Sequence, residues 1–105
     1  MSHWHKACDA NDVDNEDVVS VVVEGRKIAI FRSRSDHYFA TDLLCTHEKV
    51  SLADGLVLGN EIECPKHNGR FDYRTGKGLC APVTVDLRTY PTRVEHGVVE
   101  IEIRD

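Results

Sequence analysis

The chain lacks the features that mark membrane, secreted and nucleic-acid-binding proteins. No apolar run reaches 18 residues, which argues against a transmembrane helix. The first residues, MSHWHKACDANDVDNED, contain no apolar signal-peptide core. The formal net charge of −5 gives no basic excess for nucleic acid or for an anionic membrane surface. We therefore expect a cytoplasmic protein that binds neither nucleic acid nor membrane.

Large core-forming residues are also scarce. Aromatic residues make up 7% of the 105 residues, and there is a single methionine. A chain of this length forms one small domain, and so small a core is often stabilised by a bound metal. We expect a single domain over residues 1–105.

No segment has a convincing helical period, and short Val-, Ile-, Tyr- and Phe-rich runs alternate with turn residues instead. This pattern is typical of an all-β protein. Two hairpins are expected, one turning at Gly25 and the other at His96–Gly97. A solvated loop with at most one helical turn is expected over the acidic stretch 9–17. The predicted strands are 18–23, 27–32, 38–41, 56–58, 61–64, 70–73, 83–87, 88–95 and 98–103.

Two cysteine–histidine pairs are the strongest chemical signal. Cys45 and His47 lie in CTH, Cys64 and His67 lie in CPKH, and 16 residues separate the two motifs. In a reducing compartment, cysteines are read first as metal ligands. The four residues could bind one tetrahedral zinc in a structural, protein-binding module. Each arm contributes one cysteine and one histidine, however, and this mixed pattern favours a cluster with two distinct irons.

The motif C-x-H, a spacer of about this length and C-x-x-H resembles the Rieske [2Fe–2S] motif, in which two histidines replace two cysteines on one iron. The stretch from His67 to Ile103 and the start WHKAC resemble Rieske-type ferredoxins of bacterial ring-hydroxylating oxygenases. The resemblance implies the Rieske fold, with an antiparallel β-sandwich base and a cluster-binding subdomain at about 42–73. It also implies that Cys45 and Cys64 bind one iron, and that His47 and His67 bind the other.

The resemblance implies a soluble electron carrier that is not itself an enzyme. Such a protein passes single electrons from an NAD(P)H-dependent flavin reductase to a terminal ring-hydroxylating oxygenase, and it does not bind the aromatic substrate. The small Rieske-like subunit of an assimilatory nitrite reductase is the alternative within the family. In either case, Glu48, Lys49, Lys66 and Arg70 are candidates for a partner-docking rim.

Two departures separate this chain from the Rieske proteins of respiratory cytochrome bc complexes, which carry a disulfide between their two ligand loops. Val50 and Lys66 occupy the positions of those two cysteines. The remaining cysteines, Cys8 and Cys80, lie elsewhere and are expected to be buried or functionally indifferent thiols.

The high-potential proteins also use serine and tyrosine hydroxyls to donate hydrogen bonds near the cluster. Gly69 and Phe71 occupy those positions here and have no side-chain donor. Hydrogen bonds to the sulfurs stabilise the reduced cluster, so their loss lowers the potential. We predict a midpoint near the low end of the Rieske range, which spans about −150 to +300 mV. A redox titration that gave a value above about +100 mV on this scale would contradict the prediction.

Overall fold

The computed structural model describes residues 2–46, 49–66, 69–81 and 85–104, and in this part of the chain almost all regular structure is β-strand. The all-β class is therefore confirmed. No helix in the described ranges is long and apolar enough to cross a membrane. The elements are β1 (Ser2–Asp9), η1 (Ala10–Asp12), β2 (Asp17–Val23), β3 (Arg26–Arg32), β4 (Tyr38–Asp42), η2 (Leu52–Asp54), β5 (Leu56–Leu58), β6 (Glu61–Glu63), β7 (Arg70–Asp72), β8 (Thr89–Tyr90), β9 (Thr92–Glu95) and β10 (Val98–Arg104).

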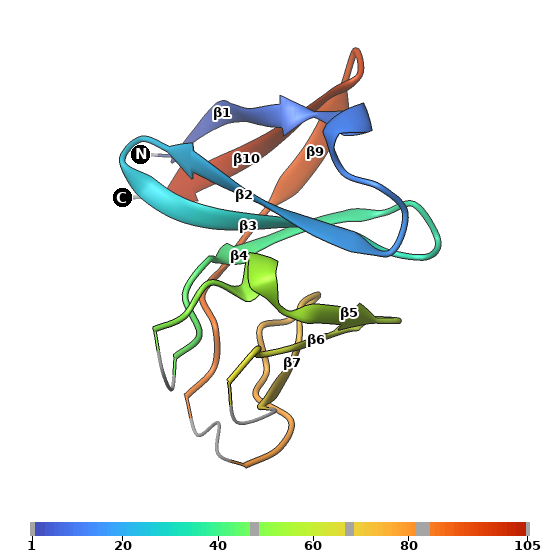
Figure 1. Ribbon diagram of the computed structural model, residues 1–105. Helices are drawn as coiled ribbons and strands as arrows, with labels where there is room; N and C mark the ends of the chain where they lie inside the picture. The colour runs from blue at the N-terminus through green and yellow to red at the C-terminus, as the bar shows by residue number, and fades with distance from the viewer. Residues whose placement is uncertain (1, 47–48, 67–68, 82–84, 105) are drawn as a thin grey trace.

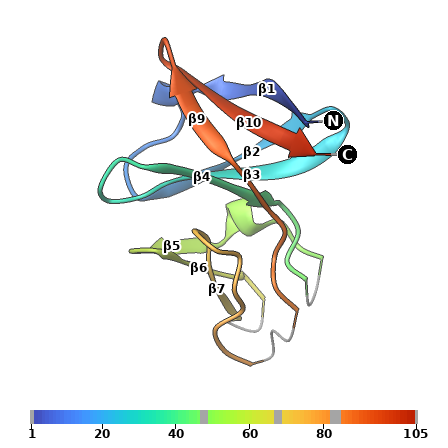
Figure 2. The same cartoon turned by 180° about the vertical axis from the view of Figure 1, so that it is seen from behind.

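The strands form three antiparallel sheets arranged in layers (Figure 1). The strand orders are β1-β10-β9, β2-β3-β4-β8 and β5-β6-β7. The first two sheets pack on each other and form what we call the base. The third sheet and the loops beside it form a small lobe below the base, and the view from behind shows the same division (Figure 2).

Both expected hairpins are confirmed. Glu24–Gly25 joins β2 to β3, and His96–Gly97 joins β9 to β10. The φ angles are 50° and 76° in the first turn and 52° and 75° in the second. Two consecutive positive φ angles define the tight turn whose twist matches that of the flanking strands, and glycine at the second position adopts this conformation without strain.

Strand β3 is buried on both faces, which explains its unbroken apolar run. Successive side chains of a strand point to opposite faces. Ile28 and Ile30 pack into the core between the two sheets of the base. Ala29 and Phe31 pack into a second core, which contains the apolar residues of the small lobe. A strand with polar residues at alternate positions could not serve both cores, so this sequence places β3 in the middle layer.

Aromatic side chains join the base to the small lobe. The rings of Phe31 and Tyr73 stack with their centroids 4.6 Å apart and their planes 3° apart. Phe39 lies against the same tyrosine, 5.7 Å away between centroids. The fully buried Tyr73 donates its hydroxyl proton to the carbonyl oxygen of Gly59, 2.5 Å away. A buried hydroxyl without a partner costs free energy, and this bond removes that cost. Because Gly59 lies in the β5–β6 turn, the bond also holds that turn against the aromatic stack.

A second connection between base and lobe is ionic. Glu16, which precedes β2, accepts hydrogen bonds from the Gly59 backbone N–H at 2.9 Å and from the Arg34 guanidinium at 2.7 Å. The Arg34 hydrogen bond lowers the pKa of Glu16 below its ordinary value, and the Gly59 N–H lowers it further. The ionised carboxylate therefore holds the β5–β6 turn to the base.

The strands of the structure differ from the predicted ones in three main respects. Strand β1 was not predicted, although it pairs with β10 along its length apart from a bulge between Lys6 and Cys8. The expected strand 83–87 is not formed at residues 85–87, and residues 82–84 lie outside the described part of the chain. The expected strand 88–95 is divided by Pro91 into β8 and β9, because proline cannot donate to a ladder.

The Glu16 connection predicts a measurable pH dependence. A carboxyl group with a depressed folded-state pKa contributes stability above its unfolded pKa, and this contribution is lost as the pH falls through the folded value. The melting temperature of the wild type should therefore fall more steeply than that of Glu16→Gln between about pH 6 and pH 3. Glu95→Gln, in β9 of the base, is the control and should follow the wild type. Parallel curves for wild type and Glu16→Gln would contradict this role.

Candidate metal centre

The first cysteine lies in a loop that turns back on itself. Cys45 follows β4, and its backbone N–H donates to the carbonyl oxygen of Val50 at 2.9 Å. Its own carbonyl accepts from the Lys49 N–H at 2.9 Å, and Lys49 adopts a positive φ of 52°. An isolated bridge between Leu44 and Ser51 closes the base of the loop. The side chain of Cys45 is thereby held inward and is only 1% exposed.

The second cysteine lies in a similar loop between β6 and β7. Glu63 and Arg70 are paired across the two strands, and the Cys64 N–H donates to the carbonyl oxygen of Gly69 at 2.7 Å. Cys64 is also 1% exposed. Both ligand loops therefore grow out of antiparallel pairings and present a buried sulfur from the same position, their first residue.

Cys45 and Cys64 both belong to the buried core that the small lobe shares with β2 and β3 of the base. Neither is part of a disulfide, and the four cysteines are all within the described residues. The other two predicted ligands, His47 and His67, lie outside the described residues. Glu48, which was expected at the docking rim, also lies outside the described residues.

The remaining cysteines do not join this pair. Cys8 is buried in the core of the base, and burial, followed by the nearby Asp12 and Asp9, raises the pKa of its thiol to about 11. A thiol with this pKa stays protonated at neutral pH, and the thiolate is the form that binds metal. Cys80 is exposed.

A third segment closes the small lobe, and sequence reasoning missed it. The hydroxyl of Thr46, next to Cys45, donates to the carbonyl oxygen of Val85 at 2.7 Å. The Leu79 N–H donates to the carbonyl oxygen of Arg70 at 2.8 Å, and the Gly78 N–H donates to the Asp86 carboxylate at 2.9 Å. The described residues between 76 and 87 are thus bonded to both ligand loops. The sequence of this segment contains a few apolar and turn residues without a regular pattern, so it gives no local signal that the segment bonds to the ligand loops.

The same segment requires a glycine at position 76. Gly76 has a φ of 81°, and a Cβ atom placed there would lie 2.2 Å from the carbonyl oxygen of Leu87. The Leu87 N–H in turn donates to the Gly76 carbonyl oxygen at 2.7 Å. The chain can therefore close at this point only because no side chain stands between the two backbones.

The positions that distinguish the subtypes surround the second ligand loop with few polar side chains. Phe71 is fully buried in the core that holds both cysteines, and the neighbouring Gly69 is buried as well. Val50 packs against the same core, whereas Lys66 is exposed. The described surroundings of Cys64 are thus more apolar than a loop with hydroxyl side chains would be.

The exposed end of the lobe combines positive charge with apolar side chains. Lys49 and Lys66 are exposed, and Leu79 and Val85 are 44% and 59% exposed. Arg70 is partly neutralised, because it lies 3.6 Å from a Glu61 oxygen and 3.8 Å from a Glu63 oxygen. The two lysines are therefore better candidates for an electrostatic rim than Arg70.

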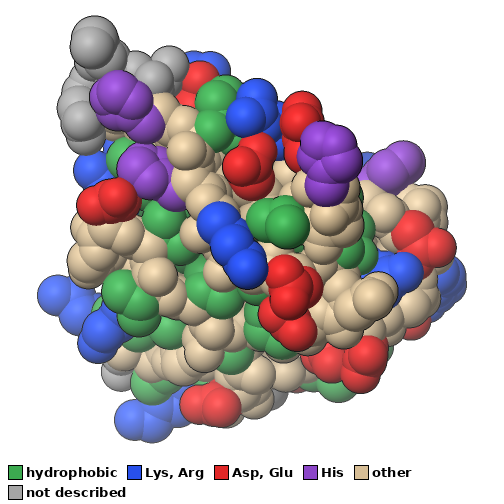
Figure 3. Space-filling view, turned by 90° about the horizontal axis from the view of Figure 1, so that it is seen from above, with side chains coloured by type: hydrophobic (Ala, Val, Ile, Leu, Met, Phe, Trp, Pro, Cys, Tyr) green, Lys and Arg blue, Asp and Glu red, His purple; other side chains and the backbone are tan. Residues whose placement is uncertain are grey.

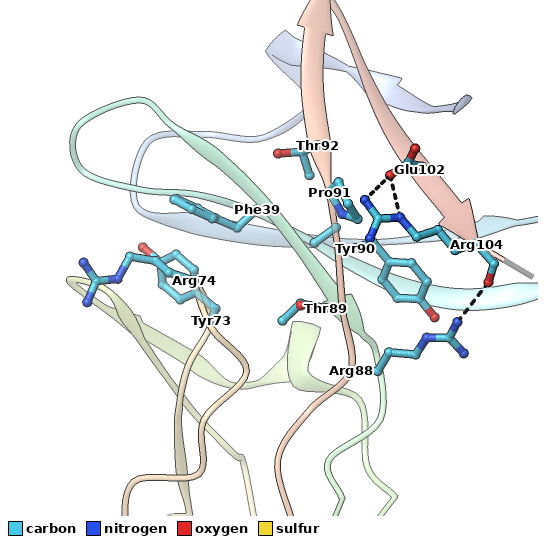
Figure 4. A pocket seen from close by; sticks show the side chains of 11 residues that line it. Phe39, Tyr73, Arg74, Arg88, Thr89, Tyr90, Pro91, Thr92, Glu102 and Arg104 are labelled. Atoms are coloured by element: carbon cyan, nitrogen blue, oxygen red, sulfur yellow. Dashed lines mark hydrogen bonds and ion pairs between the residues drawn. The ribbon is translucent and has the colours of Figure 1, made fainter. Parts of the chain in front are cut away.

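A cavity of about 460 Å³ lies elsewhere, at the junction of base and lobe (Figure 4). It is lined by arginine and tyrosine side chains, and neither Cys45 nor Cys64 is among its lining residues. Arg104 is paired with Glu102 at 2.8 Å, and Arg88 lies over the ring of Tyr90 at 5.3 Å. The cavity therefore borders the core of the cysteine pair through Tyr73 but does not reach the cysteines themselves.

The cysteine pair suits a soft metal centre. Thiolates favour zinc, copper(I) and iron–sulfur clusters, and a buried thiolate requires a cation or cluster to compensate its charge. Cys45 and Cys64 are each 1% exposed, and each lies at the start of a hydrogen-bonded loop. Both belong to one core, so together they can supply two ligands to a metal site. The two described cysteines therefore fit the thiolate ligands of an iron–sulfur cluster.

Comparisons with known proteins match this geometry. Residues 3–91 match the family model described as the Rieske [2Fe–2S] domain. The ferredoxin component of the naphthalene 1,2-dioxygenase system of Pseudomonas putida is 46% identical over 100 residues, which are 95% of each chain. The ferredoxin of Sphingomonas yanoikuyae B1 superposes with a TM-score of 0.90 at 34% identity, covering 97% of this chain and 100% of the other. A chain from the complex of reduced oxygenase and oxidised ferredoxin in carbazole 1,9a-dioxygenase gives 0.86 at 35% identity, covering 93% and 91%.

Proposed function

The chain belongs to the Rieske [2Fe–2S] domain family, and on that premise we propose that it is the ferredoxin component of an aromatic-ring-hydroxylating oxygenase system. It is an electron carrier, and the hydroxylation belongs to a separate terminal oxygenase. The observation that carries the proposal is 46% identity to a naphthalene dioxygenase ferredoxin over nearly the whole of both chains. The electron would come from an NAD(P)H-dependent flavin reductase in the cytoplasm.

One Rieske cluster is the cofactor, and its proposed ligands are Cys45, His47, Cys64 and His67. The two cysteines would bind one iron as thiolates and the two histidines would bind the other through imidazole nitrogens. The burial of Cys45 and Cys64 supports this assignment, because it protects thiolates from solvent and from oxidants. When bound, the cluster supplies a one-electron couple.

The chain's own residues would then set the environment of that couple. The apolar contacts of Phe71 and the lack of a side chain at Gly69 leave the sulfurs without side-chain donors at those two positions, which supports a low potential. The hydrogen bond from Thr46 to Val85 holds the third segment against the first ligand loop. A fixed, water-poor environment reduces the rearrangement that accompanies each change of charge.

The exposed end of the lobe is the proposed docking surface. Lys49 and Lys66 would steer an acidic partner, while Leu79 and Val85 would supply apolar contact. Weak electron-transfer complexes have small interfaces, so a few side chains suffice. We also propose that the 105 residues act as a single domain, with the cluster carried by a subdomain at about 42–73.

Reconstituted turnover tests the function. Purified protein is combined with NAD(P)H, a flavin reductase and a terminal oxygenase, and the hydroxylated product is measured. Cys64→Ser should lower the rate to the level without ferredoxin, because a buried ligand is lost. Cys80→Ser is the matched control, since this cysteine is exposed and outside the proposed ligand set, and it should keep the wild-type rate.

Visible spectra of both variants separate loss of the cluster from loss of docking. Product formation at the wild-type rate with Cys64→Ser would overturn the ligand assignment. An inactive wild type that carries its cluster, but supports a nitrite reductase in place of the oxygenase, would favour the alternative partner.

A further inference from the structure

A second group of metal-binding side chains lies at the opposite end of the molecule from the ligand loops. His3 and His5 are on β1, and Glu24 is in the β2–β3 turn. The start of β1 and this turn lie side by side beside the two chain ends, far from the small lobe (Figures 1 and 2). Together with Arg26 and Ile103, the three residues line a cavity of about 350 Å³.

Strand geometry places the two imidazoles on one face. Residues i and i+2 of a strand point to the same side. Trp4, between them, points to the other side, where the guanidinium of Arg93 lies 4.3 Å from its ring centroid. The rings of His3 and His5 are 6.3 Å apart between centroids. In the space-filling view from above, two histidine side chains lie together at one edge of the molecule, with an acidic side chain beside them (Figure 3).

We propose that His3, His5 and Glu24 form a binding site for a divalent transition-metal ion such as Zn²⁺. Two imidazoles and a carboxylate are ligands that zinc commonly takes in proteins, and an open fourth position is filled by water. Nickel and copper ions accept the same donors. The site is distinct from the cysteine pair and does not depend on the proposed electron-transfer function.

Two of the three donor atoms are already at the separation that a shared ion requires. Atoms bound at about 2.1 Å to one tetrahedral ion lie about 3.4 Å from each other. His5 Nδ1 and Glu24 Oε1 are 3.2 Å apart. Metal binding competes with protons for such ligands, so an ion bound by both atoms would require His5 Nδ1 to be unprotonated.

The third donor needs a small movement. No three metal-ligating side chains within the described ranges already converge on one point. Imidazoles on a common tetrahedral ion have ring centroids about 5 Å apart, so His3 must approach His5 by about 1 Å. His3 is exposed, and an exposed side chain changes rotamer readily.

The charges around the cavity limit the affinity without preventing binding. Arg26 is the one cationic side chain among its lining residues. Its side chain is hydrogen-bonded to the hydroxyl of Tyr90. Lys6, on the opposite face of β1, is paired with Asp9 at 3.3 Å.

Such an ion would connect the two sheets of the base. His3 and His5 belong to the β1-β10-β9 sheet, whereas Glu24 belongs to the turn of the β2-β3-β4-β8 sheet. Strand β1 is the edge of its sheet and pairs only with β10 among the described strands. A ligand that binds the folded state stabilises it, so Zn²⁺ should raise the melting temperature by fastening β1.

Calorimetric titration with Zn²⁺ tests the site. The protein is the untagged, cluster-loaded full chain, with Cys80→Ser introduced into every sample to remove the exposed thiol as a competing ligand. We expect one saturable equivalent. His5→Gln and Glu24→Gln should each weaken the affinity at least about tenfold, which corresponds to 1.4 kcal/mol. Both changes should also abolish the rise in melting temperature.

His96→Gln is the matched control, because His96 is exposed in the β9–β10 turn, and it should bind Zn²⁺ as strongly as the parent. Glu24→Gln changes only an exposed turn residue, so its effect cannot be ascribed to misfolding. Unaltered affinity in either His5→Gln or Glu24→Gln would overturn the site, and so would non-saturating binding in the parent. Binding lost equally in His96→Gln would also overturn it.

Discussion

The rest of the structure depends on the burial of β3 on both faces. Ile28 and Ile30 complete the core of the base, while Ala29 and Phe31 begin the core that contains Cys45 and Cys64. One seven-residue strand therefore couples the stability of the sandwich to the shape of the metal centre. Truncating a buried phenylalanine typically costs about 3–5 kcal/mol, so loss of the Phe31–Tyr73 stack would disturb both.

The base and the small lobe have different roles, and this difference suits electron transfer. The base stabilises the molecule, and its Glu16 holds the β5–β6 turn by a hydrogen bond. The small lobe provides two buried sulfurs, each at the start of a hairpin-like loop. The exposed lysines and apolar residues lie on the lobe, so a partner can approach the proposed cluster without contacting the base. A carrier of this kind needs a short path to the surface and little rearrangement, and the fold suits both requirements.

Local signals explain which parts could be predicted from the sequence. The alternation of Val99, Ile101 and Ile103 with Glu100 and Glu102 places β10 correctly, and two turns ending in glycine place both hairpins. The motif spacing pointed to Cys45 and Cys64, which both lie in one core, while the ligand set itself stays a prediction. Strand β1 was missed because SHWHKACD has few apolar residues, and it becomes a strand through its pairing with β10.

The third segment of the lobe was missed for a related reason. Its main bond joins Thr46 to Val85, 39 residues apart, and such a contact leaves no periodic pattern in the sequence. The strand expected at 83–87 does not form at its described residues, because Asp86 and Leu87 bond to Gly78 and Gly76 across the loop and not to a neighbouring strand.

The ligation of two irons by two cysteines and two histidines is the central claim, and electron paramagnetic resonance of the reduced protein tests it most directly. The account predicts a signal whose average g value lies below that of the free electron, with hyperfine coupling to nitrogen from two imidazoles. Substituting His47 or His67 should remove that coupling or the cluster itself. A reduced protein without this signal, or with a signal that lacks nitrogen coupling, would contradict the account.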